Sequence, residues 1–125
     1  MPAKRILVID DEEDIQTVVR IGLSLQGWEA ISATSGKQGI ALALALQPDA
    51  ILLDMMMPVM DGLSTLKELR SHPDGKHIPA IFLTAQADAS DRQRLYLAGS
   101  SGIIAKPFDV LTLAEQVAQI LNWSP

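Results

Sequence analysis

The sequence contains no cysteine, which excludes disulfide scaffolds, thiol catalysis and cysteine-ligated zinc or iron–sulfur sites. Aromatic residues make up only 4% of the chain, so its core must be aliphatic. No apolar run approaches the roughly 18 residues of a membrane span. The first apolar run ends at Ile9, too short for the apolar region of about 7–15 residues in a signal peptide. We therefore expect a cytoplasmic protein without membrane insertion.

Positive charge is also in the minority, with 10 Lys and Arg against 15 Asp and Glu and a net charge of −5. Acidic chains bind nucleic acid poorly, so we expect no direct nucleic-acid contact. Apolar residues at 48% and charged residues at 20% are ordinary for a globular protein. From the length of 125 residues we expect a single domain over residues 1–125, with no second domain in this chain.

Short apolar runs alternate with helical patterns along the whole chain. The expected strands are Arg5–Asp10, Glu29–Ala33, Ala50–Asp54, Ile78–Thr84 and Gly102–Lys106. Five helices are expected between and after these strands. The first has Ile15, Val18, Val19 and Leu23 on its apolar face and is stopped by Gly27; the second and third span Gly36–Gln47 and Gly62–Ser71. The fourth is capped by Asp88, and the fifth is capped by Asp109 and has Val110, Leu113, Val117 and Ile120 on its apolar face.

The segment Gly36–Gln47 carries an ambiguous pattern, because its leucines alternate with alanine at the period of a strand. Alanine and leucine are strong helix formers, which favours a helix. In a helix, Leu42 and Leu46 point away from Ile40 and Leu44. The pair then belongs to a wide buried face, or consists of scattered surface leucines, or forms a small patch for a partner or a second copy of the chain.

Strict alternation of five strands and five helices predicts an α/β fold, with a parallel sheet covered on both faces. In such sheets functional groups gather at the carboxyl ends of the strands. Polar residues stand at those ends here: Asp10, Asp11, Asp54, Thr84 and Lys106. Each alone would be weak evidence, because a carboxylate or hydroxyl after a strand often only caps a helix. Their conjunction at four strand ends predicts a shared site.

Three carboxylates, one hydroxyl and one ammonium suit a particular chemistry. Oxygen ligands without histidine or cysteine select a hard cation such as Mg²⁺. A metal, an ammonium and a hydroxyl together make a receptor for a phosphoryl group. A carboxylate beside that receptor can act as a nucleophile, and Asp54 is the candidate because it ends a central strand alone.

Four segments together resemble the receiver domain of bacterial two-component response regulators, of the single-domain chemotaxis type. They are Val8–Asp14, Pro48–Gly62, Ile78–Ala85 and Ala105–Phe108. The resemblance implies a flavodoxin-like, doubly wound sheet of five parallel strands in the order 2-1-3-4-5 with five helices.

The resemblance also implies residue roles. Asp54 would accept a phosphoryl group from a phosphohistidine on a sensor histidine kinase or histidine phosphotransfer protein. Mg²⁺ would be held by Asp10, Asp11, Asp54 and the backbone carbonyl of Met56. Lys106 would pair with the phosphoryl group.

A switch is implied as well. Thr84 would swing to hydrogen-bond the phosphoryl group, with the small Ala85 leaving room, and the bond from Lys106 to Pro107 would be cis. Phosphorylation would change the face of the fourth helix, fifth strand and fifth helix for a downstream protein. A second copy of the chain is a further candidate partner.

The chain departs from the family pattern at two positions. Ile103 stands where the family usually has an aromatic residue coupled to the threonine, so the mode of readout is open. Met56 stands where many members have a polar residue on the path of the hydrolytic water, and we expect it to shield the acyl phosphate.

Three other readings compete with this one. A phosphorylation-independent binding module would usually have lost an acidic residue or the lysine, and all are present here. A phosphohydrolase of the haloacid-dehalogenase type would carry its second aspartate two residues after the first, where this chain has Glu12. A flavodoxin-type flavin protein would need a phosphate loop where this chain has the acidic run Asp10–Asp14.

Overall fold

The computed structural model describes residues 3–85 and 88–123. Its elements in chain order are β1 (Arg5–Ile9), α1 (Glu13–Ser24), β2 (Glu29–Ala33), α2 (Gly36–Leu46), β3 (Ala50–Asp54), α3 (Gly62–Ser71), a 3-10 turn (Pro73–Gly75), β4 (Ala80–Thr84), α4 (Ala89–Leu97), β5 (Gly102–Ala105) and α5 (Leu113–Leu121). The strands form one parallel sheet in the order β2-β1-β3-β4-β5. The predicted fold and strand order are therefore confirmed.

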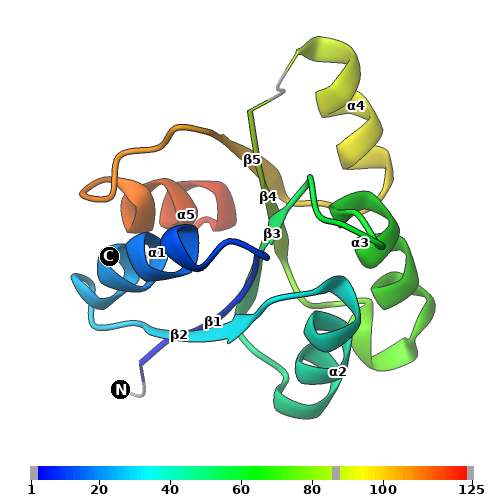
Figure 1. The fold of residues 1–125 in the computed structure, drawn as a ribbon, viewed down its shortest axis with the longest axis horizontal. Helices are drawn as coiled ribbons and strands as arrows, with labels where there is room; N and C mark the ends of the chain where they lie inside the picture. Colours follow the sequence, from blue (N-terminus) through cyan, green and yellow to red (C-terminus); the bar gives the residue numbers. More distant parts are fainter. Residues whose placement is uncertain (1–2, 86–87, 124–125) are drawn as a thin grey trace.

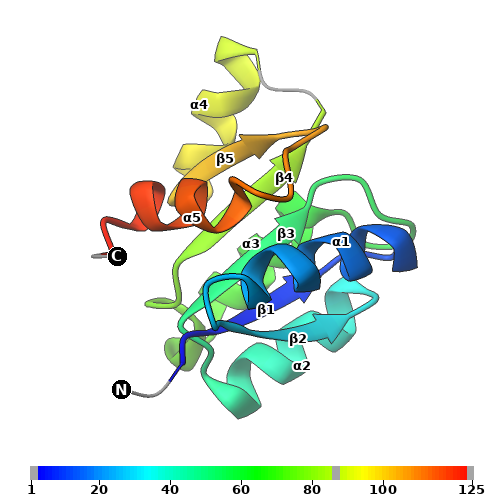
Figure 2. The ribbon, with the colours of Figure 1, turned by 90° about the vertical axis from the view of Figure 1, so that its left-hand side faces the viewer.

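The sheet lies between two layers of helices (Figures 1 and 2), with α1 and α5 on one face and α2, α3 and α4 on the other. Strands β1, β3 and β4 supply an aliphatic core on both faces, as the scarcity of aromatics predicts. Phe82 is the largest fully buried side chain. Helix α4 is the least embedded element: Leu95 is its only buried residue within the described range, and the helix projects from the body in Figure 1.

Most helix ends follow the predicted capping chemistry. The side chains of Ser35, Asp61 and Asp88 accept backbone hydrogen bonds at the starts of α2, α3 and α4. Gly27 adopts a left-handed conformation after α1, with φ of 76°, which a glycine allows at no steric cost.

The last helix begins later than predicted. Asp109 does not cap it, because its side chain accepts from the N–H of Leu111 and its carbonyl from the N–H of Thr112, which closes a turn. Helix α5 starts only at Leu113, so Val110 lies outside it. The fourth strand is also shorter than predicted and begins at Ala80, after Pro79, which has no N–H to donate to a ladder.

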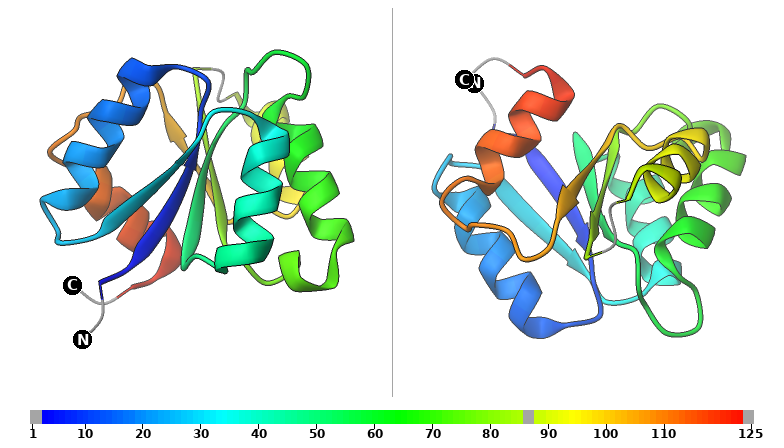
Figure 3. Two further views of the ribbon diagram at one scale, coloured as in Figure 1. Left: turned by 60° about the horizontal axis from the view of Figure 1, so that its bottom comes forward. Right: turned by 90° about the horizontal axis from the view of Figure 1, so that it is seen from above.

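The segment after α5 lies beside the starts of β1 and β2, at the amino-terminal edge of the sheet. The ring of Trp123, just after α5, packs edge-to-face on Trp28 at 5.4 Å between centroids, and the Lys4 ammonium lies 4.5 Å from the Trp123 ring. Figure 3 shows the end of α5 beside the start of β1. Among the described residues, no helix combines the length and apolar character needed to cross a bilayer.

Candidate functional site

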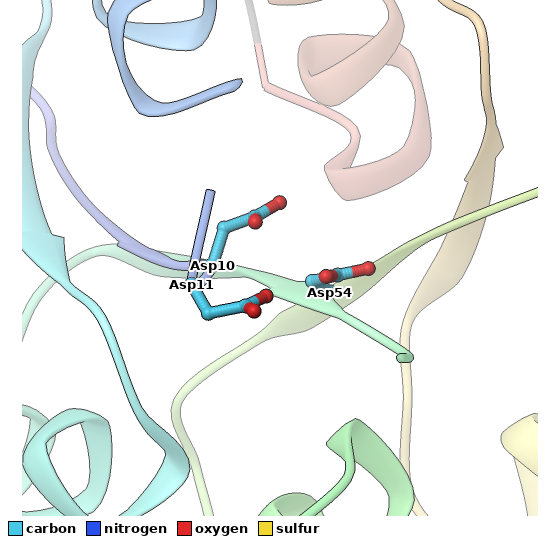
Figure 4. A group of neighbouring side chains, drawn as sticks. All are labelled: Asp10, Asp11 and Asp54. Carbon is cyan, nitrogen blue, oxygen red and sulfur yellow. The ribbon is translucent and has the colours of Figure 1, made fainter. Parts of the chain in front are cut away.

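Three carboxylates converge at the carboxyl edge of the sheet. Asp10 and Asp11 follow β1, and Asp54 is the last residue of β3. Each offers an oxygen within 4.8 Å of the others, and Figure 4 shows the three side chains directed into the same space. Asp10 and Asp54 are buried, whereas Asp11 is exposed. The sheet thus brings together residues 43 or more positions apart in sequence (54 − 11).

Lys106 completes this cluster from the end of β5. Its ammonium lies 3.1 Å from an Asp54 oxygen and 3.5 Å from an Asp10 oxygen, with a fifth of its side chain exposed. The ammonium therefore bridges two buried carboxylates that would otherwise repel each other. The predicted meeting of Asp10, Asp11, Asp54 and Lys106 is found in the structure.

The acidic cluster perturbs its own ionisation. Burial raises the pKa of Asp10 above its ordinary value, and the charge of Asp54 adds to this; the Glu12 N–H and Lys106 act against it. Burial alone would lower the pKa of Lys106, but the hydrogen bond to Asp54 and the two carboxylate charges outweigh it, so that pKa is raised. Lys106 is therefore held as a cation, whereas ionised Asp10 lacks full compensation.

The loop after Asp54 turns back sharply. The N–H of Met56 donates to an Asp54 carboxylate oxygen at 3.4 Å, and the N–H of Gly62 donates to the Met55 carbonyl at 2.9 Å. A Cβ at Gly62 would overlap the Asp54 carbonyl oxygen, so glycine permits this close approach. The Met56 side chain is 71% exposed.

The residues predicted to form the switch surround this edge. Thr84 ends β4 and is buried, whereas Ala85 is exposed. Ile103 lies on β5 opposite Phe82 and packs partly buried against the core under α2, α3 and α4. The bond between Lys106 and Pro107 is cis, as the resemblance predicts.

Two hollows flank the cluster. An apolar groove of about 300 Å³ lies between α1 and the segment after β5; Ile15, Val18, Ala85, Lys106, Pro107 and Phe108 line it. A more polar cavity of about 190 Å³ lies between the loop after β3 and α4; its lining includes Met56, Thr84, Asp91 and Arg94. Lys106 of the cluster thus borders an apolar hollow, and Met55, the residue after Asp54, borders a polar one.

One sequence interpretation of a helix face needs correction. Val18, expected on the apolar face of α1, is 37% exposed, and the buried polar residue of that helix is Gln16, which the sequence pattern did not single out. On α2, Leu42 packs against the core and Leu46 remains 36% exposed, which agrees with wide burial and a scattered surface leucine rather than with a partner-binding patch. The signal for Gln16 was its spacing three residues before Val19, on the same helical face.

This donor set fits Mg²⁺. All three carboxylates offer hard oxygen ligands, and one buried Asp10 oxygen has no hydrogen-bond partner among the described residues. That oxygen faces the Lys106 ammonium at 3.5 Å, and a cation beside it would offset the negative charge that burial leaves uncompensated. The arrangement combines a metal-binding set, a fixed ammonium and a carboxylate at the end of a central strand.

The fold is a flavodoxin-like parallel sheet that carries an acidic cluster and a lysine at its carboxyl edge. Residues 6–118 match the model of the response regulator receiver domain. The chain belongs to this family, as its sequence resemblance predicts.

Relatives and solved structures agree with this assignment. The chain is 38% identical over 118 residues to the DNA-binding dual master transcriptional regulator RpaA of Synechocystis, a match covering 94% of this chain and 49% of that protein. The chain thus spans about half the length of that relative. It is similar to chemotaxis protein CheY4 of Vibrio cholerae, with a TM-score of 0.89 and 28% identity over 95% of this chain and 99% of that one.

One similar structure contains a metal. It is the receiver domain of sensor histidine kinase PA1611 from Pseudomonas aeruginosa, with a magnesium ion coordinated in its active site cleft. That domain is 34% identical, with a TM-score of 0.83, over 98% of each chain.

Proposed function

We propose that this chain is a phosphorylation-controlled switch in which Asp54 accepts a phosphoryl group from a phosphohistidine. The observation that carries this proposal is the Lys106 ammonium 3.1 Å from Asp54, with Asp10 and Asp11 within 4.8 Å. The chain acts on its own side chain, not as an enzyme on external substrates. The intact acidic cluster and lysine also favour this function over a binding module that is never phosphorylated.

The residues proposed to hold Mg²⁺ are Asp10, Asp11, Asp54 and the Met56 carbonyl. Bound there, Mg²⁺ would offset the negative charge of the carboxylates and of the incoming phosphoryl oxygens. Asp10 supplies a buried oxygen that has no hydrogen-bond partner in the described part of the chain, and Asp11 supplies an exposed one that solvent can reach.

The proposed phosphoryl transfer is a nucleophilic displacement at phosphorus. An Asp54 carboxylate oxygen attacks phosphorus, forming a phosphorus–oxygen bond as the phosphorus–nitrogen bond to the donor imidazole breaks. The departing imidazole nitrogen takes up a proton. Lys106, freed from part of its pairing with Asp54, faces the new phosphoryl oxygens as a cation.

The response of the fold is proposed to start at Thr84, the buried residue that ends β4. Its hydroxyl would turn towards the phosphoryl group, with exposed Ala85 leaving space for that movement. Ile103 would follow in place of an aromatic side chain, and Pro107 keeps Lys106 in register. Because α4 is weakly embedded, the face of α4, β5 and α5 is the proposed surface for a downstream protein.

The setting completes the proposal. A sensor histidine kinase or phosphotransfer protein would be the donor, in the cytoplasm, where kinases draw on ATP. The chain would act as one receiver domain over residues 1–125, with self-association as a second use of its surfaces. A net charge of −5 supports signalling through protein contacts rather than direct nucleic-acid binding.

The test is intact mass after incubation with a small acyl-phosphate donor, with Mg²⁺ and then with a chelator. We expect a gain of one phosphoryl group only with Mg²⁺. A folded protein that gains none from this donor or from a phosphorylated sensor kinase would contradict the proposal.

Replacing Met56 by asparagine tests the proposed shielding of the acyl phosphate. We expect Met56→Asn to shorten the lifetime of the phosphoprotein up to about tenfold, or ~1.4 kcal/mol in the barrier, because an amide can orient an attacking water. The measurement is the decay of phosphorylated mass after donor removal. Val59→Asn is the matched control, since Val59 is fully exposed in the same loop and its left-handed backbone suits asparagine. Equal lifetimes for wild type and Met56→Asn would sink the idea.

The apolar groove beside Lys106 is the proposed docking place of the phosphohistidine protein. Val18 lines it, and Ile21 and Leu25 extend an exposed apolar strip along α1. We expect Val18→Glu to slow transfer from a phosphorylated donor protein by about tenfold or more, because docking would desolvate the new charge. Uptake from a small acyl phosphate should stay unchanged.

Leu97→Glu is the control for that variant, because Leu97 is exposed on α4, away from the groove. Both variants are to be compared by transfer rate from the same phosphorylated protein. If Leu97→Glu slows transfer and Val18→Glu does not, the donor docks elsewhere.

A further inference from the structure

Gln16 is the buried polar side chain on the sheet-facing side of α1. It is 5% exposed, on the same helical face as buried Val19 and Leu23. Its amide nitrogen lies 2.9 Å from the Val8 carbonyl, 3.1 Å from the Asp10 carbonyl and 2.9 Å from the Ala33 carbonyl. One side-chain amide therefore gathers three main-chain acceptors.

Those acceptors lie where β1 and β2 end, at the edge that carries the acidic cluster. The Ala33 carbonyl also accepts from the N–H of Asp10 at 3.0 Å. Asp10 is thus held at its N–H by β2 and at its carbonyl by Gln16. This fixes the plane of the peptide group that joins Asp10 to Asp11.

The two carboxylates depend on this backbone in different ways. The Asp10 side chain has its own restraint, because one of its oxygens accepts from the N–H of Glu12 at 2.9 Å. The Asp11 side chain is exposed, and no hydrogen bond to it is found among the described residues. Asp11 is therefore restrained through its backbone, and the peptide group on its amino-terminal side is the one that Gln16 holds.

We propose that Gln16 is a positioning residue of the acidic site, which sets Asp11 relative to Asp10 and Asp54 through the backbone. This inference rests on the proposed function, because it assigns Gln16 to the cation-binding step of that site. Gln16 touches neither the cation nor the phosphoryl group and acts only through the carbonyls.

The unused half of the Gln16 amide supports this role. Its oxygen is buried and lacks a hydrogen-bond partner within the described part of the chain. Burying an unpaired amide oxygen is unfavourable, and an apolar residue of the same size would avoid it. We therefore attribute the presence of glutamine at this position to the hydrogen bonds that its amide nitrogen donates.

The test compares Gln16→Met, which keeps the size and removes the donors, with Val19→Ala. Val19 is fully buried on the same face of α1, but its side chain cannot donate to a strand carbonyl. The Val19→Ala variant therefore loses stability but keeps the hydrogen bonds from the Gln16 amide to the backbone. Mg²⁺ affinity is measured by calorimetry on the folded proteins, and amide resonances of Asp11 and Glu12 are recorded without metal. Gln16→Asn is the second variant, since it keeps the amide and shortens its reach.

We expect Gln16→Met to bind Mg²⁺ ten- to hundredfold more weakly, the usual range for residues that orient metal ligands. The Asp11 and Glu12 resonances should shift, and Gln16→Asn should follow the same trend. Val19→Ala should keep wild-type affinity and resonances whatever its stability. Wild-type affinity and unshifted resonances in Gln16→Met would overturn this inference alone, whereas a wild type that binds no Mg²⁺ would overturn the proposed function with it.

Discussion

Asp54→Asn is expected to abolish phosphoryl uptake completely. The amide is isosteric with the carboxylate but is not a nucleophile, so no acyl phosphate can form at that position. The variant should keep the fold, because an amide oxygen can still accept from Lys106 and from the Met56 N–H. Intact mass after treatment with Mg²⁺ and the acyl-phosphate donor measures the result.

Asp11→Asn is the matched control for this experiment. It removes one carboxylate from the same cluster without touching the nucleophile, so phosphorylation should slow rather than disappear. If Asp54→Asn still gained one phosphoryl group at the wild-type rate, the phosphoacceptor would be another residue and the proposed role of Asp54 would be wrong.

Asp10→Asn is expected to stabilise the metal-free protein while weakening its binding of Mg²⁺ at least tenfold. The Asp10 carboxyl is fully buried, one of its oxygens lacks a hydrogen bond among the described residues, and burial and Asp54 raise its pKa. Removing that charge should raise the free energy of unfolding by about 1–3 kcal/mol, the cost of a buried group without full hydrogen bonding. Lys106 keeps its closer partner, Asp54.

The difference in stability between Asp10→Asn and the wild type should depend on pH. Because the pKa of Asp10 is raised above the ordinary value of 3.8, the folded state binds more protons than the unfolded state between the two values. The stability of the wild type therefore falls as pH rises through that window, and the advantage of Asp10→Asn grows and then levels off. Urea unfolding with and without Mg²⁺ measures it. Asp11→Asn removes an exposed charge and should show no such gain; a loss of stability in Asp10→Asn at pH 7 would contradict the argument.

The carboxyl-end residues could be predicted because the sheet rule is topological. Asp10, Asp54 and Lys106 interrupt apolar strands at their ends, and parallel strands bring those ends to one edge whatever the loops do. The rule cannot predict which side chains form ion pairs. It does not say, for example, that the Lys106 ammonium lies between Asp54 and Asp10 rather than in solvent. That arrangement depends on side-chain packing across three strands.

The predictions that failed rested on local sequence patterns that are compatible with more than one local conformation. An aspartate side chain accepts backbone hydrogen bonds in turns as well as at helix starts, so Asp109 alone could not distinguish a turn from the start of a helix. On α1 the apolar arc is wider than the surface that the sheet and α5 cover, which leaves Val18 exposed. Gln16 was missed because a polar residue on a helix is usually solvated, and only the strand carbonyls above it explain its burial.

The contact of Trp28, Trp123 and Lys4 has a spectroscopic consequence. Both tryptophans of the chain stand at the amino-terminal edge of the sheet, whereas Asp54 and its neighbours occupy the carboxyl-terminal edge. Their emission depends on the contact between their rings, which joins Trp123, after α5, to Trp28, just before β2; Lys4, just before β1, lies against the Trp123 ring. Intrinsic fluorescence is therefore expected to report separation of the end of α5 from the start of β2 as the domain unfolds, and to stay unchanged by events around the acidic cluster at the opposite edge.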